Sequence, residues 1–243
     1  MGVIYEPKGR ALEYSELACN LYMGCSHGCR YCFAPGCMRT TLEKWQSDPH
    51  CRKNVIAEFE KDAKRLAGRN EQRPILFSFL SDPYQPLEAR EHLTRQALEI
   101  VRHYGLKSKI LTKGSAALIA EDLPLMKSAG TQLGITLSFS NDASRRHWEP
   151  NASSVADRID ILRRAHDSGI HTWVSMEPVI IPGEALELLQ DLCQYVDLWK
   201  IGKLNHFREI EMTVDWKAFR EQAIDILERQ KAKYYIKKDL AEI

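Results

Sequence analysis

The amino-acid sequence predicts an α/β fold, a partial (β/α)6 TIM-like barrel, and three observations lead to this class. Short apolar runs alternate with amphipathic stretches of helical length, as parallel strands joined by crossover helices do. Six such units follow one another, and 243 residues suit one packing unit of this kind. No repeat, low-complexity segment or Pro/Gly/Ser-rich linker divides the chain. We therefore expect a single domain over residues 1–243, with the barrel at about 17–231.

The elements of this barrel follow from the pattern in chain order. The expected strands are short apolar runs, at about 17–23, 74–81, 108–113, 132–139, 171–177 and 196–202. The expected helices are the amphipathic stretches that follow each strand, at about 52–67, 88–104, 115–129, 153–168, 183–194 and 215–231. A glycine-rich loop lies between the first strand and the first helix. The Tyr-Tyr-Ile-Lys-Lys run at 234–238 predicts a short extra strand.

The last three barrel strands predict a polar lumen, because alternate residues of a barrel strand face either the outer helices or the interior. On the fourth strand, Ser138 and Ser140 lie on a face of small and polar residues opposite an apolar one. Glu177 and Lys200 face inward on the fifth and sixth strands. A filled barrel would have branched apolar residues there. We therefore expect a ligand space at the strand ends, where Glu177 and Lys200 either contact substrate as catalytic residues or form a structural ion pair.

Composition and charge exclude several classes of protein. Thirty-four Lys and Arg against 33 Asp and Glu leave a formal charge of +1, which excludes a strongly basic nucleic-acid coat. Because 44% of the residues are hydrophobic and 28% are charged, the balance is that of a globular protein rather than a disordered one. The sequence has no signal peptide and no apolar run of about 18 residues, so we expect a soluble, cytoplasmic protein without a membrane partner.

Five of the seven cysteines lie within 19 residues, and Cys25, Cys29 and Cys32 have the spacing Cys-x3-Cys-x2-Cys. An odd, clustered set predicts metal binding by thiolates in a reducing compartment rather than a disulfide framework. A [4Fe-4S] cluster normally takes four cysteines, so three would leave one iron open to another molecule. Structural zinc, with Cys37 or His27 as fourth ligand, is the alternative, although no second ligand pair follows Cys37.

Further motifs accompany the cysteine loop between about residues 14 and 205. They are Asn20-Leu21-Tyr22-Met23-Gly24-Cys25, Tyr31, Ser81-Asp82-Pro83-Tyr84-Gln85-Pro86-Leu87-Glu88, Leu111-Thr112-Lys113, Trp148-Glu149-Pro150 and Lys200-Ile201-Gly202-Lys203-Leu204-Asn205. With the loop at 24–37, they resemble the radical S-adenosylmethionine superfamily, in the branch that contains spore photoproduct lyase and DNA repair photolyase-like proteins.

This resemblance implies a [4Fe-4S] cluster held by the three loop cysteines, with S-adenosylmethionine on the open iron. An electron from a flavodoxin or ferredoxin-type donor would cleave the cofactor to methionine and a 5′-deoxyadenosyl radical, which abstracts hydrogen from a substrate. The family positions also imply cofactor-binding residues. They are Tyr31 along the adenine, Ser81 and Asp82 at the methionine amino group, Lys113 at the carboxylate, and Ser138 or Ser140 at the ribose.

The substrate is left open by the motifs. The family favours a nucleic-acid base or nucleotide, and the runner-up is a maturase that acts on a peptide or protein partner. A non-catalytic iron–sulfur or zinc module is the alternative from a different class. Spore photoproduct lyase has a hydrogen-donor cysteine near the end of the second strand, where this chain has Ser78-Phe79-Leu80-Ser81, so thymine-dimer repair by that route is not predicted. Cys37 is a hydrogen-atom donor, an auxiliary ligand or an unreactive loop thiol.

Overall fold

The computed structural model describes residues 2–77 and 79–243, and its central element is an eight-stranded sheet in the order β1-β2-β5-β6-β7-β8-β9-β10. Neighbouring strands from β2 to β10 are parallel, whereas β1 runs antiparallel to β2. The bounds are β1 Ile4–Tyr5, β2 Leu17–Cys19, β5 Ile75–Phe77, β6 Ser108–Thr112, β7 Gln132–Thr136, β8 Thr172–Val179, β9 Leu198–Lys203 and β10 Tyr234–Ile236. A separate antiparallel pair is formed by β3 Tyr22–Met23 and β4 His50–Cys51.

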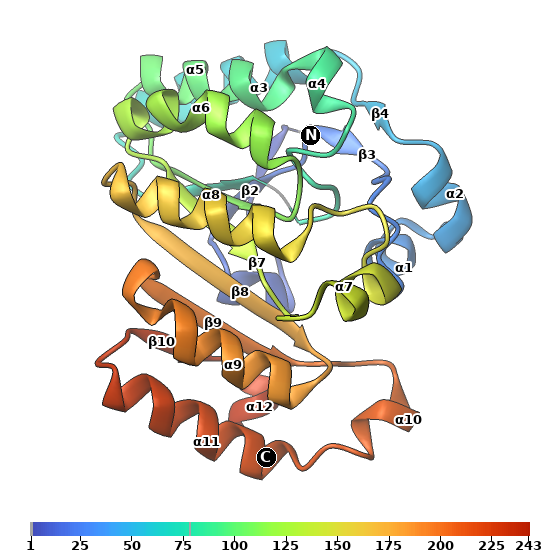
Figure 1. Ribbon diagram of the computed structural model, residues 1–243. Helices are drawn as coiled ribbons and strands as arrows, with labels where there is room; N and C mark the ends of the chain where they lie inside the picture. Colours follow the sequence, from blue (N-terminus) through green and yellow to red (C-terminus); the bar gives the residue numbers. More distant parts are fainter. Residues whose placement is uncertain (1, 78) are drawn as a thin grey trace.

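Helices connect the strands and cover the outer side of the curved sheet (Figure 1). The long ones are α3 Val55–Ala67, α5 Leu93–His103, α6 Ala116–Ala129, α8 Val155–Asp167, α9 Pro182–Leu192 and α11 Trp216–Arg229. The short ones are α1 Ala34–Met38, α2 Leu42–Ser47, α4 Glu88–Glu91, α7 Asp142–Trp148, α10 Arg208–Glu211, α12 Lys238–Ala241 and the 3-10 helices η1 Gly9–Glu13 and η2 Cys193–Tyr195. The prediction of an α/β partial barrel is confirmed, and β10 is the predicted extra strand.

Side-chain caps explain where several of these helices begin. Ser115, Ser154 and Asp215 each accept a hydrogen bond from the backbone N–H three residues further on, which satisfies a donor that the helix itself leaves free. The helix predicted at 88–104 is divided into α4 and α5, because His92 between them is in the left-handed region with φ of 51°.

Two strands end earlier than the sequence predicts. The run at 17–23 is divided, so that Tyr22 and Met23 leave the barrel and pair with β4. The run at 74–81 ends as a strand at Phe77, and position 78 lies outside the described residues. Asn20 causes part of this ending, because its Oδ1 accepts hydrogen bonds from the backbone N–H groups of Phe79 and Leu80 at 3.0 and 2.9 Å. Those amides are therefore not available to a neighbouring strand.

The two faces of the last strands separate as the period-two pattern predicts. The apolar residues of the outer face pack in the main core under the helices, which contains Leu133, Ile135, Val174, Met176, Trp199 and Ile201. On the inner face, Tyr14, Ala18, Leu76 and Trp173 form a second, smaller apolar cluster. Gly134 is required there, because a Cβ at this position would lie 2.1 Å from Cε2 of Trp173. Part of the lumen is therefore filled by aromatic rings rather than left open.

The segment between β1 and β2 crosses to the opposite edge of the sheet. Glu13 accepts hydrogen bonds from the Tyr235 hydroxyl at 3.3 Å and from the Lys238 backbone N–H at 3.1 Å. Arg10 forms an ion pair with Asp239 at 3.2 Å. Because β1 and β10 are the two edge strands, this segment closes the open side of the partial barrel.

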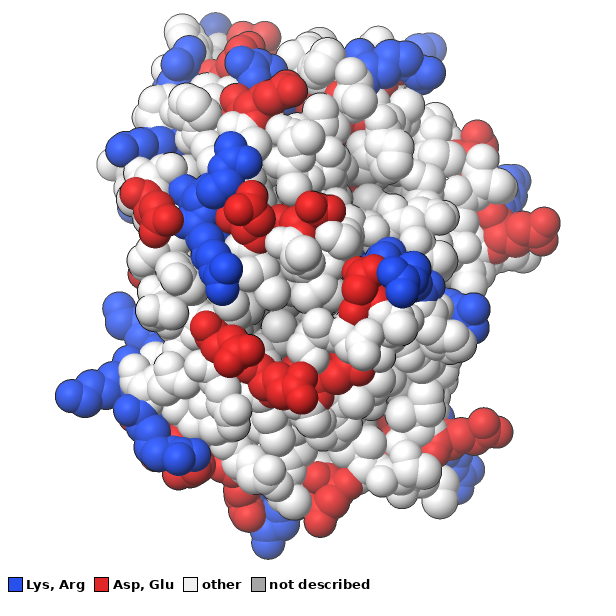
Figure 2. All heavy atoms as spheres, viewed as in Figure 1, with Lys and Arg blue, Asp and Glu red and all other residues white. Residues whose placement is uncertain are grey.

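The surface carries charges of both signs. Figure 2 shows Lys and Arg side chains interspersed with Asp and Glu, with a row of acidic side chains across the middle of this face. No broad basic area is visible on the face shown, in agreement with the formal charge of +1. Within the described residues, none of the helices combines the length and the apolar character needed to cross a bilayer.

Candidate functional site

The three-cysteine loop follows β3 and is fixed from outside by α2. The Cys25 backbone N–H donates to the Trp45 carbonyl at 3.1 Å, and the Gln46 side chain donates to the Cys29 carbonyl at 3.2 Å. Gly24 has φ of +76°, and a Cβ there would lie 2.8 Å from Cα of Pro49. The loop therefore needs glycine at this position both for its backbone conformation and for the close approach of the α2–β4 segment.

The three thiols face a partly enclosed environment. Cys29 is buried and Cys25 and Cys32 are half-buried, and all three are free of disulfides. Burial raises the pKa of each thiol, that of Cys29 to about 11, so the thiols are protonated at neutral pH unless a cation compensates the thiolate charge. Metal ions supply such compensation and deprotonate coordinating thiols. Three thiolates from one loop are the donor type that an iron–sulfur centre takes, so the residues present fit such a centre.

A single metal ion fits the loop less well than a polynuclear centre. Within residues 2–77 and 79–243, no three His, Cys, Asp or Glu side chains converge closely enough to hold one ion. A zinc ion would need its sulfur ligands within about 2.3 Å of one centre. A four-iron cluster takes one cysteine at each iron and so holds its ligands farther apart.

A buried ion network lies beside the loop at the carboxyl ends of β6 and β7. Lys113 donates to the Tyr31 hydroxyl at 2.6 Å and to Oε1 of Glu149 at 3.0 Å, and the Tyr31 hydroxyl also bonds Glu149. Arg158 forms an ion pair with Oε2 of Glu149 at 2.6 Å and donates to the Thr136 carbonyl at 3.1 Å. The structure thus brings the predicted Lys113 and Tyr31 together, and it adds Glu149 and Arg158, which the sequence did not assign to the site.

The charges of this network fix its protonation state. Burial opposes ionisation of Glu149, but Arg158 and then Lys113 outweigh it and lower the pKa of Glu149 to about 2. Burial would also lower the pKa of Lys113, yet the nearby Cys29 and Glu149 raise it well above its usual range. Because Glu149 and Arg158 are almost completely buried and Lys113 is largely so, the three groups form one charged unit next to the cysteine loop.

Asp82 joins the end of β5 to the end of β6. Its carboxylate accepts hydrogen bonds from the Thr112 hydroxyl at 2.6 Å and from the Lys113 and Tyr84 backbone N–H groups at 2.8 Å. His27 lies 3.4 Å from the same carboxylate. Burial would raise the pKa of Asp82, but His27 and these hydrogen bonds lower it. Asp82 is thus an ionised buried group that connects the cysteine loop to the strand bearing Lys113.

The three predicted serines have different environments. The Ser81 hydroxyl donates to the Tyr22 carbonyl at 3.0 Å. Ser138, two residues after the end of β7, is fully buried, and its hydroxyl has no hydrogen-bond partner among the described residues. Ser140 instead donates to Glu187 on α9 at 2.5 Å, and the structure does not bring it together with Ser138. An unpartnered buried hydroxyl is costly in a folded protein, and a bound polar ligand would satisfy it.

Glu177 and Lys200 lie in the lumen, but they are not each other's hydrogen-bond partner. Both oxygens of Glu177 accept from Lys237, at 2.7 and 2.6 Å, and the Tyr14 hydroxyl donates to the same carboxylate. Lys200 donates to the Glu13 carbonyl, and its Nζ lies 5.0 Å from the centroid of the Tyr14 ring. Of the two expected roles, the ion pair between Glu177 and Lys200 is therefore not formed, and Glu177 pairs instead with Lys237, a residue that sequence reasoning missed.

Sequence reasoning also missed Lys109, a second lysine of the lumen. Lys109 donates to the Tyr14 carbonyl, on the same segment whose Glu13 carbonyl receives Lys200. Burial lowers the pKa of each of these two lysines to about 8. Period-two alternation from Leu111 would have placed Lys109 on the inner face, so a signal for it was present in the sequence.

Comparisons with known proteins agree with the resemblance seen in the motifs. A family model described as the Radical SAM superfamily matches residues 19–196. An uncharacterized protein of Methanocaldococcus jannaschii is 30% identical over 163 residues, which covers 66% of this chain and 59% of that protein. The radical SAM Nalpha-GlyT isomerase of Pseudomonas phage M6 is 32% identical over 107 residues, covering 44% of this chain and 22% of that protein. The chain thus spans only part of the length of these relatives.

Solved structures share the fold at low sequence identity. A spore photoproduct lyase mutant with bound AdoMet and dinucleoside spore photoproduct superposes with a TM-score of 0.71 at 14% identity, covering 96% of this chain and 78% of that chain. Streptococcus suis SuiB bound to the precursor peptide SuiA superposes with a TM-score of 0.58 at 14% identity, covering 79% of this chain and 43% of that chain.

Proposed function

Because this chain belongs to the radical SAM superfamily, we propose that it is an enzyme that generates a 5′-deoxyadenosyl radical and uses it to abstract hydrogen from a substrate. Members of the superfamily use a [4Fe-4S] cluster and S-adenosylmethionine. When bound, the reduced cluster supplies the electron that cleaves the sulfonium bond of S-adenosylmethionine. The observation that carries the proposal is the set of three buried or half-buried thiols beside a charged network that ends in Lys113.

Cys25, Cys29 and Cys32 hold the cluster in this proposal. Three free thiols within one loop support it, and the hydrogen bonds to the Trp45 carbonyl and from the Gln46 side chain hold the loop in place. His27 is buried in the same loop and lies against Asp82, so its role is to position the loop rather than to bind iron.

The cofactor-binding residues of the proposal surround the loop on the barrel side. Lys113 binds the methionine carboxylate, and its ion pair with Glu149 holds its ammonium group near the cysteine loop. Ser81 and Asp82 serve the methionine amino group, for which the ionised Asp82 carboxylate is a suitable acceptor. Tyr31 lies along the adenine. The unpartnered hydroxyl of Ser138 supports a ribose contact, and Ser140 stays an expected second contact there.

The substrate of the proposal occupies the lumen above Tyr14 and Trp173, within reach of Glu177 and Lys200. A nucleic-acid base or nucleotide is favoured, because the spore photoproduct lyase structure with the same fold contains a dinucleoside spore photoproduct. Aromatic rings beside a lysine suit a flat base. The mixed surface charge in Figure 2 favours a short single-stranded or small substrate over a long duplex.

Two alternatives are retained. A radical maturase of a peptide or protein partner is supported by the fold shared with SuiB, whose structure contains a precursor peptide. A non-catalytic iron–sulfur or zinc module has less support, because a purely structural role gives no reason for the unpartnered Ser138 hydroxyl. A flavodoxin or ferredoxin-type donor supplies the electron, and we expect the protein in the cytoplasm, where thiols stay reduced.

Anaerobic reconstitution with iron and sulfide, followed by an assay of 5′-deoxyadenosine under dithionite, tests the proposal. We expect cleavage of S-adenosylmethionine that a nucleotide or short single-stranded oligonucleotide stimulates. Stimulation by peptides alone would favour the maturase. Glu177→Gln and Lys200→Met should lower product formation while uncoupled cleavage continues, because cleavage needs only cluster, cofactor and electron.

A further inference from the structure

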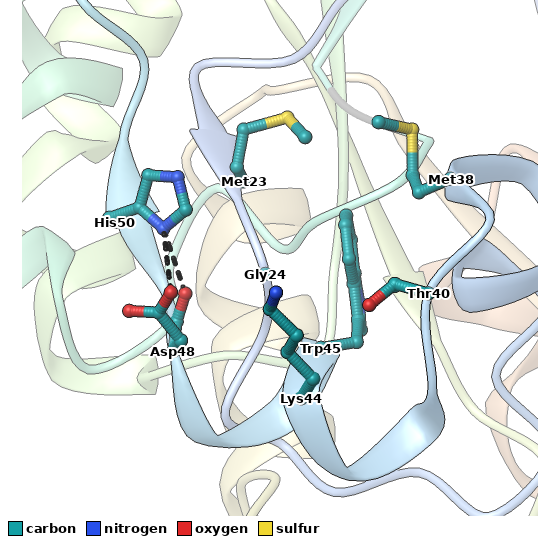
Figure 3. Close-up of a pocket in the computed structure, with 8 residues that line it drawn as sticks. All are labelled: Met23, Gly24, Met38, Thr40, Lys44, Trp45, Asp48 and His50. Carbon is teal, nitrogen blue, oxygen red and sulfur yellow. Dashed lines mark hydrogen bonds and ion pairs between the residues drawn. The ribbon is translucent and has the colours of Figure 1, made fainter.

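The lumen holds buried charged groups, whereas a hollow between the cysteine loop and α2 holds exposed ones. Figure 3 shows this hollow, with Lys44, Asp48 and His50 among the residues that line it. All three are exposed, and His50 already contacts Asp48. In the lumen, Lys237 is only 3% exposed and binds Glu177. Because hydrogen bonds are stronger where water is excluded, the lumen is the place where a polar side chain can select a ligand.

Glu177 is held by two donors in the lumen. Lys237 donates to its Oε1 at 2.7 Å and to its Oε2 at 2.6 Å, and the Tyr14 hydroxyl donates to Oε2. Because Tyr14 has one hydroxyl proton, the Ser175 hydroxyl is the donor in its 2.8 Å contact with Tyr14. Burial and then the charge of Glu177 raise the pKa of Tyr14 well above its usual range, so the phenol stays protonated. The ion-paired carboxylate is therefore fixed as a hydrogen-bond acceptor.

One acceptor site of this carboxylate is left open. A carboxylate oxygen can accept two hydrogen bonds. Lys237 and Tyr14 occupy both sites of Oε2, whereas Oε1 accepts only from Lys237 among the described residues. The Glu177 side chain is 20% exposed, and its contact with Tyr14 places it on the inner face. Gly202 adds no cover, since a Cβ there would lie 3.1 Å from the Glu177 carboxyl carbon. The free site of Oε1 thus opens into the lumen, toward a ligand that offers a donor.

An aromatic wall adjoins this acceptor. The Tyr14 ring packs edge-to-face on Phe79, with ring centroids 5.9 Å apart, and lies against Trp173 at 6.1 Å. Trp173 is buried, but Phe79 is only half-buried and keeps ring surface for a ligand. Since Phe79 and Glu177 both contact Tyr14, the ring surface and the open oxygen adjoin the same side chain. A flat heterocycle with an N–H group on its edge satisfies both, because the ring stacks and the N–H donates.

We propose that Glu177 accepts a hydrogen bond from an N–H group on the edge of a substrate base, and that Tyr14 and Lys237 are positioning residues that aim its open oxygen. The inference rests on the proposed function and names the group of the substrate that the lumen recognises. A base whose edge N–H groups are replaced by N-methyl groups leaves this acceptor unpaired, so it binds more weakly. The lumen therefore discriminates by a hydrogen bond as well as by shape.

Matched nucleosides test this assignment by calorimetry on the reconstituted protein with S-adenosylmethionine and no reductant. The probes are thymidine, 2′-deoxycytidine, 2′-deoxyadenosine and 2′-deoxyinosine, each beside the analogue whose edge N–H groups are methylated. For the nucleoside that binds best, methylation should weaken binding about ten- to a hundredfold, the range for a hydrogen bond to a charged group. In Glu177→Gln the single amide oxygen is drawn to Lys237 and Tyr14, and the NH2 group faces the lumen. Methylation should then change the affinity less than about threefold.

Two further variants separate the positioning role from a structural one. Tyr14→Phe keeps the ring but removes a donor to Glu177, so it should reduce the preference for the unmethylated nucleoside. Glu99→Gln makes the same change as Glu177→Gln at an exposed carboxylate on α5 and should leave the preference unchanged. The ratio of the two affinities is measured on one folded protein, so a loss of stability alone does not alter it.

The outcomes separate this inference from the proposed function. Equal binding of both members of every pair, or a preference that Glu177→Gln retains, would overturn the role of Glu177. If no nucleoside binds to a protein that still cleaves S-adenosylmethionine under dithionite, the base as substrate is overturned and the radical chemistry stays. Failure of the unchanged protein to cleave S-adenosylmethionine even with dithionite would overturn the proposed function itself. Should Glu177→Gln lose iron, Tyr14→Phe decides, because an unchanged preference in that variant contradicts the positioning role.

Discussion

Glu149→Gln should be strongly destabilising, because Glu149 contacts both Lys113 and Arg158 in the buried network. The Arg158 contact is 2.6 Å and the Lys113 contact 3.0 Å, and the carboxylate is completely buried. Removal of the partner of a buried charge costs about 3–5 kcal/mol. The depressed pKa gives a similar figure, because a fall from 4.5 to about 2 corresponds to about 3 kcal/mol at neutral pH.

Denaturant unfolding and thermal unfolding of the cluster-free chain, both followed by tryptophan fluorescence, measure this loss. A destabilisation of this size should lower Tm by about 6–20 °C in a protein of this length. Asp160→Asn is the matched control, since the Asp160–Arg164 pair is exposed at 3.7 Å and should contribute no more than about 0.5 kcal/mol. Because the folded pKa of Glu149 lies below the unfolded one, its stabilisation is complete above pH 4.5 and is lost as the pH falls toward 2. A loss below about 1 kcal/mol at pH 7, or one that does not shrink on acidification, would refute this description of the network.

Three further predictions concern the loop, the cofactor and the lumen. Alanine at any one of the three loop cysteines should reduce the iron content from about four atoms per chain to almost none, whereas the Cys51→Ala variant should keep its iron. Iron analysis after anaerobic reconstitution measures both. Lys113→Ala should weaken S-adenosylmethionine binding by about 1.5–3 kcal/mol in calorimetry, and unchanged affinity would remove Lys113 from the site. Burial lowers the pKa of Lys200 from 10.5 to about 8, so the unfolded chain holds this proton more tightly than the folded chain. The free energy of unfolding of the wild type should therefore rise, relative to that of Lys200→Met, as the pH rises from 8 to 10.5. The rise should reach up to about 3 kcal/mol. Parallel pH profiles of unfolding for the two proteins would contradict that sign.

The sequence predicted those features that depend on local pattern. The period-two alternation placed Val174 and Met176 under the helices and Glu177 in the lumen, because successive side chains of a strand point to opposite faces whatever the rest of the chain does. The helices were expected within a few residues of their observed bounds for the same reason, since a 3.6-residue apolar period is itself local.

The partners of the site residues could not be predicted in this way. Glu177 pairs with Lys237, which is 60 residues away near the end of the chain, and Tyr14 reaches it from the beginning. Such contacts depend on how the two edges of the sheet approach each other, and no short-range period encodes that distance. Glu149 was noted within a motif, but its role required Arg158, whose side chain is brought to it by the start of α8.

The central claim is that the loop cysteines bind a cluster that reductively cleaves S-adenosylmethionine. Electron paramagnetic resonance of the anaerobically reconstituted, dithionite-reduced protein, recorded with and without S-adenosylmethionine and followed by a 5′-deoxyadenosine assay of the same sample, tests it most directly. The account predicts the signal of a reduced four-iron cluster, a change in that signal when S-adenosylmethionine is added, and 5′-deoxyadenosine as product. Stoichiometric zinc without iron, or a four-iron signal that S-adenosylmethionine leaves unchanged and that yields no 5′-deoxyadenosine, would contradict it.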